Sequence, residues 1–164
     1  MLFISDANIF IDLYNCGLLD EFDQLNLDIR TTDFVFNELN PAQQKIVKSM
    51  NIMVHSLEPQ ELTDFFSTFG SLGQLKISYQ DYSVFHFAQQ LNGAVLTNDG
   101  ALRKFAKNRS VEAKGLFYIL DAIIHTSTKD KTVLITALEL LLRNEWLPKN
   151  EITKRIEQIR KGVS

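Results

Sequence analysis

Short, continuously apolar runs separated by amphipathic stretches constrain the fold of this chain more than any other feature. Residues Leu2–Ile4 and Ala94–Thr97 form two such runs, which are typical of strands buried on both faces of a sheet. The stretches between them, such as 8–19 and 78–91, carry apolar residues at helical spacing. Strands separated by helices indicate an α/β fold with a mostly parallel central sheet and right-handed crossovers.

The remaining elements follow from the same patterns. Further strands are expected at 28–30, at 52–54 and, as an edge strand, at 111–113. Further helices are expected at 33–39, from Pro41, after Asp99, and at 59–69, 116–124, 133–146 and 151–161. The last helix is amphipathic, and we expect its polar side to hold Lys154, Arg155, Arg160 and Lys161.

The composition is that of an ordinary soluble protein. A chain of 164 residues suits one domain with a substantial core. No apolar stretch approaches the roughly 20 residues that span a bilayer, so no membrane partner is expected, and the start MLFISD is not typical of a signal peptide. Cys16 is the only cysteine, which excludes an intrachain disulfide and favours a cytoplasmic location.

Charge is distributed unevenly along the chain. Residues 1–82 contain 12 acids and 4 bases, whereas residues 83–164 contain 8 acids and 13 bases. Such asymmetry is a hint of nucleic-acid contact, because phosphates require a basic surface even on an acidic protein. The alternative is that the charges interleave in the folded chain.

Four acids fall where one cleft can collect them. Asp6 directly follows the first predicted strand, and Asp99 follows the strand at 94–97. Glu38 and Asp81 are expected in the first turns of two helices. Ligands of parallel sheets bind beyond the carboxyl ends of the strands, so these positions predict a shared site.

Each acid also has a purely structural interpretation. Asp6 and Asp99 can be helix N-caps, and Asp81 can complete a capping box with Ser78. Glu38 can be a solvated helix residue. The structural interpretation is the stronger one for each acid alone, but the four positions together favour a site.

Carboxylates without cysteines or clustered histidines indicate a hard cation with oxygen ligands. His55, His86 and His125 are scattered, and none has the spacing of a metal ligand. Mg²⁺ keeps several of its waters, so we expect an open site that can hold a phosphate. The metal is expected to orient a water molecule and lower its pKa.

Four segments around these acids resemble PIN-domain proteins over the stretch from Met1 to about Leu120. They are Ile4–Leu13, Phe36–Leu39, Ser78–Ser83 and Leu96–Arg103. Each segment alone is a weak signal. The four acids in this order, at spacings of 32, 43 and 18 residues, are a strong one.

The resemblance implies a three-layer α/β/α sandwich and Mg²⁺- or Mn²⁺-dependent hydrolysis of RNA phosphodiester bonds. It matches Asp6, Glu38, Asp81 and Asp99 to the family's acidic quartet, and Asn8 and Thr97 to polar positions near it. Asp6 and Asp99 are expected to contact metal, Asp81 to bind metal or position its waters, and Glu38 to help deprotonate the attacking water.

This chain departs from the family pattern at one place. Many members have a further acid shortly after the position that Asp99 matches, whereas Gly100, Ala101 and Leu102 follow here. A second metal ion is therefore expected to bind weakly, or only together with substrate.

The resemblance also suggests partners. Bacterial members are often toxins of toxin–antitoxin pairs, as in the VapC group, so an antitoxin is expected alongside the RNA substrate. The C-terminal helices at 133–146 and 151–161 are expected to pack on the domain, to form a homodimer or to receive the antitoxin, and the sequence does not choose among these. Backbone contacts are expected from Arg103, Lys104 and Lys107, with Arg109 and Lys114 nearby. Tyr79 and Tyr82 flank Asp81 and either stack on bases or pack in the core.

We expect residues 1–125 to form the nuclease domain and residues 126–164 a helical extension packed on it. One alternative function is a non-catalytic PIN-fold module that binds RNA or a protein. Another is a phosphoaspartyl hydrolase that uses Asp6. Its chemistry normally needs a second aspartate two residues later, where this chain has Asn8.

Overall fold

The computed structural model describes residues 1–50, 52–74 and 76–162, and the chain divides into two compact units. Unit 1 contains Met1–Phe10 and Leu27–Leu116. Unit 2 contains Ile11–Asn26 and the residues from Phe117 onward. Each unit is described by itself.

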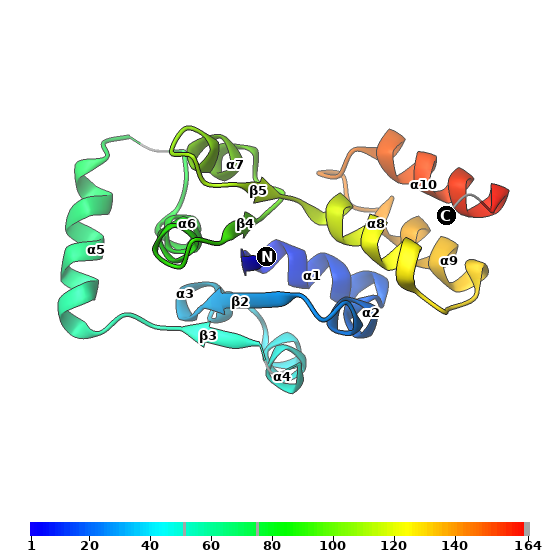
Figure 1. Cartoon of the computed structure of the whole chain (residues 1–164), viewed down its shortest axis with the longest axis horizontal. Helices are drawn as coiled ribbons and strands as arrows, with labels where there is room; N and C mark the ends of the chain where they lie inside the picture. The colour runs from blue at the N-terminus through cyan, green and yellow to red at the C-terminus, as the bar shows by residue number, and fades with distance from the viewer. Residues whose placement is uncertain (51, 75, 163–164) are drawn as a thin grey trace. The chain divides into compact units, whose positions relative to one another are not determined.

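Unit 1 is built on a five-stranded, all-parallel sheet (Figure 1). Its strands are β1 (Leu2–Ser5), β2 (Asp28–Thr32), β3 (Met53–His55), β4 (Ala94–Leu96) and β5 (Ala113–Lys114). β1 and β4 are buried almost throughout, as their unbroken apolar sequences predict. The predicted α/β fold with a parallel central sheet is confirmed.

The order of the strands places a switch point at the centre of the sheet. The order is β3-β2-β1-β4-β5, so the chain moves to one side of β1 for β2 and β3, and to the other side for β4 and β5. Phe3 pairs with Ala94, and Ser5 pairs with Leu96. The carboxyl ends of β1 and β4 therefore lie side by side, where ligands of parallel sheets bind.

Helices flank this sheet. They are α3 (Asp33–Phe36), α4 (Pro41–Ser49), α5 (Pro59–Ser71), α6 (Tyr79–Gln90) and α7 (Gly100–Lys107), together with the start of α1 (Ala7–Cys16). α6 packs against β1, β2 and β4 through a face that includes the buried side chains of Val84 and Ala88. It ends as predicted near Asn92, whose φ of 52° leads the chain into β4.

Unit 2 is helical, with α2 (Leu19–Gln24), α8 (Leu116–Thr126), α9 (Lys131–Leu141) and α10 (Lys149–Lys161). Arg155 of α10 was expected on the polar side of its helix, but it is buried. Its guanidinium donates to both carboxylate oxygens of Asp121 at 2.7 and 2.8 Å, and it lies 4.5 Å from the ring centroid of Phe117. No helix among the described residues is long and apolar enough to cross a membrane.

Several predicted boundaries are wrong for local reasons. The helix expected at 8–19 ends at Cys16, because Gly17 has a φ of 75°, and the separate α2 that follows was not predicted. The helix expected at 33–39 ends at Phe36 and the one expected at 133–146 ends at Leu141. The edge strand lies at 113–114 instead of 111–113.

Candidate active site

Asp6 lies at the carboxyl end of β1, where the sheet switches direction. Its backbone N–H donates to the Leu96 carbonyl at 3.0 Å, which continues the β1–β4 pairing by one residue. Its side chain is buried, with 3% exposed. One carboxylate oxygen, Oδ1, accepts the Ile9 N–H at 3.1 Å, and Oδ2 accepts the Thr97 hydroxyl.

Thr97 connects Asp6 to Asp99. While its hydroxyl donates to Asp6, its oxygen accepts the Asp99 backbone N–H at 3.0 Å. Thr97 is fully buried, so this arrangement is shielded from water. Asp99 is the N-cap of α7 and accepts the Leu102 N–H at 2.6 Å through Oδ1. Thr97, which was predicted to lie near these acids, thus contacts both of them.

Asp81 is half-buried in the first turn of α6, where the predicted capping box is present. Its N–H donates to Ser78 Oγ at 3.1 Å, and Oδ2 accepts the Ser78 N–H at 3.3 Å. Burial raises the pKa of Asp81, the hydrogen bonds with Ser78 oppose this rise, and the charge of Asp99 adds to it. The negative charge of Asp99 therefore makes Asp81 harder to ionise.

Glu38 lies just beyond the end of α3, so its expected place in the first turns of a helix is wrong. Its N–H donates to the Val35 carbonyl at 3.0 Å in the turn that follows the helix. The residue as a whole is exposed, but partial removal of water from its carboxylate raises its pKa, and the charge of Asp81 raises it further.

The four acids thus form a series of neighbouring pairs. Thr97 forms hydrogen bonds with both Asp6 and Asp99. The charge of Asp99 raises the pKa of Asp81, and the charge of Asp81 raises the pKa of Glu38. As the side chains stand, no three Asp, Glu, His or Cys residues in the described part of the chain form a group that could hold a metal ion.

The chemistry of the donors, although not their present grouping, suits a hard divalent cation. All the donors are carboxylate or hydroxyl oxygens, and Mg²⁺ commonly uses one or two carboxylates while keeping several waters. Within the described residues, Asp99 Oδ2 and Asp81 Oδ1 accept no hydrogen bond. Each therefore retains a ligand oxygen while its other oxygen caps a helix.

Asn8 and the three basic residues expected to contact the RNA backbone lie at the surface. Asn8 is exposed in the first turn of α1, and it makes no hydrogen bond to the acids within the described residues. Arg103, Lys104 and Lys107 are exposed on α7, the helix that Asp99 caps. Arg103 and Lys107 are four residues apart, so they lie on the same face of this helix.

Asn98 was not predicted as part of the site. Its Oδ1 accepts the Leu116 N–H at 2.9 Å, whereas its Nδ2 is buried without a hydrogen-bond partner among the described residues. A Cβ on Gly115 would approach Asn98 Oδ1 to 2.9 Å and Arg103 Nη1 to 3.3 Å. The signal available in the sequence was a polar residue between Thr97 and Asp99 at a strand end.

Two comparisons with known proteins bear on this geometry. A family model, DUF3368, described as a PIN domain, matches residues 2–161. The matched range includes the C-terminal helices α9 and α10, beyond the stretch to about Leu120 that carried the sequence resemblance. No curated protein matches the chain.

Proposed function

The chain belongs to the PIN-domain family, and from this membership we propose that it is a metal-dependent endoribonuclease that hydrolyses RNA phosphodiester bonds. One observation carries the proposal. Asp6 and Asp99 follow two adjacent strands at the switch point of the sheet and share the hydroxyl group of Thr97. Asp81 and Glu38 extend this pair into a quartet coupled by charge.

We propose that Asp6, Asp81 and Asp99 hold a single Mg²⁺ or Mn²⁺ ion in the absence of substrate. When bound, this ion supplies Lewis acidity, which lowers the pKa of water and offsets charge on the phosphoryl group. The helix caps and Thr97 keep the carboxylates in place. The protein therefore has little to reorganise when the substrate arrives.

Glu38 is suited to accept a proton from the attacking water. The residue as a whole is exposed, so water can reach it, and its pKa is raised by partial desolvation of the carboxylate and by the charge of Asp81. A base works best when its pKa lies near the operating pH. Glu38 therefore has a different role in the proposal from the three aspartates.

The basic residues of α7 supply the RNA contact in this proposal. Arg103, Lys104 and Lys107 are exposed on the helix that begins at Asp99. Phosphate contacts by Lys and Arg provide the sequence-independent part of nucleic-acid affinity. We therefore place the RNA backbone along α7.

A toxin that acts in the cytoplasm, is held by an antitoxin and forms a homodimer is the finer version of this proposal. Trp146 in unit 2 supports an interface, because its side chain is 93% exposed and exposed tryptophans are enriched where proteins associate. Expression of the wild type should then arrest growth, whereas expression of Asp6→Asn should not. Sedimentation should show a dimer.

The alternative is a non-catalytic module that keeps the fold and binds RNA or a protein. It is favoured by one observation, namely that no three acids among the described residues are grouped closely enough to hold a metal ion. The two functions differ in whether RNA is cut.

An RNA-cleavage assay with added Mg²⁺, Mn²⁺ or EDTA separates these functions. Cleavage should require a divalent ion. Asp6→Asn should reduce it at least about 100-fold, equivalent to about 2.7 kcal/mol of transition-state stabilisation. Asp20→Asn changes an exposed aspartate of α2 and should cleave like the wild type. Cleavage that persists in EDTA or in Asp6→Asn would refute the proposal.

A further inference from the structure

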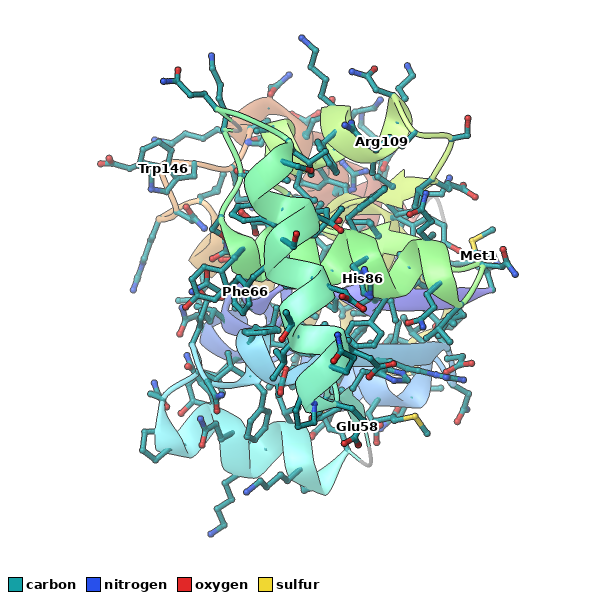
Figure 2. All side chains as sticks on the ribbon, turned by 90° about the vertical axis from the view of Figure 1, so that its left-hand side faces the viewer. Met1, Glu58, Phe66, His86, Arg109 and Trp146 are labelled. Atoms are coloured by element: carbon teal, nitrogen blue, oxygen red, sulfur yellow. The ribbon has the colours of Figure 1, made fainter. Side chains whose placement is uncertain are left out.

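Three aromatic rings form a continuous surface in unit 1. The ring centroids of Phe34 and Tyr79 are 5.6 Å apart, those of Phe66 and Tyr79 are 5.7 Å apart, and those of Phe34 and Phe66 are 6.0 Å apart. Phe66 is 45% exposed and Tyr79 is 40% exposed. We call these three residues the aromatic array. Figure 2 looks toward α5 and labels Phe66 on one side of that helix.

Buried aromatic residues support the array from below. Phe34 stacks on Phe65 with ring centroids 5.5 Å apart, and Phe65 in turn lies 4.9 Å from Tyr82. Phe65 and Tyr82 are only 2% and 5% exposed. Of the two tyrosines that flank Asp81, Tyr82 therefore packs in the core and Tyr79 faces solvent. A surface held on packed rings is already ordered before any ligand binds.

The array belongs to the same chain segments as two acids of the candidate active site. Tyr79 and Asp81 both lie in the first turn of α6, at the same end of this helix, although residues two apart point to different sides of it. Glu38 follows Phe34 by four residues, across the end of α3. Phe34 lies two residues after the carboxyl end of β2 and contacts Tyr79, so the array lies at the edge of the sheet where Asp6 and Asp99 also lie.

The chemistry of the array suits bases better than phosphates. One turn away from Phe66 on α5 lie Leu62, Thr63, Phe69 and Gly70, none of which carries a charge. The array therefore offers flat rings, and the charged residues that next follow Phe34 and Tyr79 in the chain, Glu38 and Asp81, are acids, which repel a phosphate instead of holding it. Bases stack on aromatic side chains regardless of their sequence, because every base has a π-face.

We propose that the aromatic array stacks the bases of single-stranded RNA next to the phosphodiester held at the acidic site. The inference rests on the proposed function and adds a base-binding surface to it. Base-paired RNA does not fit, because its bases are already stacked and only unpaired bases can be splayed onto aromatic side chains. Together with α7, the array gives the substrate one surface for its bases and another for its phosphates.

The test compares two labelled strands of equal length in EDTA, where no cleavage interferes. One is a short oligoadenylate, and the other is an abasic strand with the same sugar-phosphate backbone. Fluorescence anisotropy should show that the full chain prefers the strand with bases. Phe66→Leu and Tyr79→Leu keep apolar side chains but remove the rings, and each should weaken oligoadenylate binding by about fivefold or more without changing abasic binding.

Two variants serve as controls. Phe66→Tyr keeps the ring and should bind like the wild type. Tyr118→Leu removes another tyrosine that is 40% exposed but lies outside the array, and it should also bind like the wild type. Circular dichroism should show that the Leu variants fold, since Phe66 and Tyr79 are surface residues.

The inference is overturned if both Leu variants keep the wild-type preference for bases, or if the wild type shows no such preference. The array would then serve another partner, such as a protein. This outcome is distinct from failure of the proposed function. If the chain binds bases through Phe66 but does not cut RNA, the proposed function fails and the base-binding role of the array stands. If the chain cuts RNA but its binding does not depend on Phe66 or Tyr79, the inference about the array fails and the proposed function stands.

Discussion

At the residue scale, the acids of the site serve the backbone as well as the proposed chemistry. Asp6 and Asp99 accept backbone N–H groups at the starts of α1 and α7, and Asp81 completes the capping box of α6. The structural interpretations weighed for these three residues are therefore confirmed. For Asp81 and Asp99 the cap does not compete with the site, because it occupies one carboxylate oxygen and leaves the other.

Two substitutions of Asp99 separate these functions. Asp99→Asn keeps an oxygen for the Leu102 N–H and removes the charge. Without metal, its free energy of unfolding should therefore lie within about 0.5 kcal/mol of the wild-type value. Asp99→Ala removes the cap and should cost about 1 kcal/mol. Both should abolish cleavage. Urea denaturation measures the unfolding free energies of both variants. A large loss of stability in Asp99→Asn would make Asp99 a structural residue only.

The raised pKa of Asp81 predicts a pH-dependent stability. Between the ordinary and the raised pKa, the folded protein binds more protons than the unfolded chain, so this residue stabilises the fold as the pH falls. Without metal, Asp81→Asn should therefore be more stable than the wild type at neutral pH. The difference should shrink as the pH falls through the raised pKa. Unfolding free energies measured across this range check the prediction.

Asp130 provides a control of opposite sign. Hydrogen bonds from Thr132 lower its pKa, so its ionised form stabilises the fold above its ordinary pKa, and this contribution is lost as the pH falls through the lowered value. Asp130→Asn should therefore be less stable than the wild type at neutral pH and should approach it in acid. Parallel curves for the Asp81 and Asp130 variants would contradict both assignments.

At the scale of the elements, the spacing of apolar residues predicted the strands and helices that local sequence determines. The buried strands β1 and β4 and the helix α6 follow directly from apolar runs and a capping box. The end of α3 before Glu38 and the break at Gly17 were missed, because a short turn leaves the apolar spacing almost unchanged. The order of the strands could not be predicted from local patterns, because it depends on contacts between distant segments. The hydrogen bond between Thr97 and Asp6, for example, joins residues that are 91 positions apart.

Gly93 tests how closely β1 and β4 are packed. A Cβ at this position would lie 2.9 Å from the Leu2 carbonyl oxygen and 3.0 Å from Leu2 Cγ. Gly93→Ala should therefore force the start of β4 away from β1 and cost about 1–3 kcal/mol of stability. Gly70→Ala is the matched control, because nothing lies within 4 Å of the new Cβ in α5. It should stabilise the protein by up to about 1 kcal/mol. Equal effects in denaturation would contradict the close approach.

At the scale of the whole molecule, the net charge of −3 conceals the basic second half of the chain. From the sequence we expected Arg103, Lys104 and Lys107 to contact the RNA backbone, and the structure shows all three exposed on α7. Composition alone leaves open whether such charges gather or interleave. Their exposure on the helix that Asp99 caps is a property of the fold.

Salt dependence measures this contribution. If Lys107 contacts a phosphate, Lys107→Gln should reduce the magnitude of the slope of log K against log salt by about 0.7 for a single-stranded RNA. Lys149→Gln changes an exposed lysine at the start of α10 and should leave the slope unchanged. Anisotropy titrations at several salt concentrations give both slopes. Identical slopes in wild type and Lys107→Gln would remove Lys107 from the RNA surface.

The central claim is that acids from distant parts of the chain share one divalent ion. Calorimetric titration of Mn²⁺ into the full chain tests it without any need for a substrate. We predict one site that is lost or weakened at least about tenfold in Asp6→Asn, Asp81→Asn and Asp99→Asn, a change of about 1.4 kcal/mol each, and that is unchanged in Asp20→Asn. Binding of Mn²⁺ that is the same in the wild type and in all three variants would contradict the account.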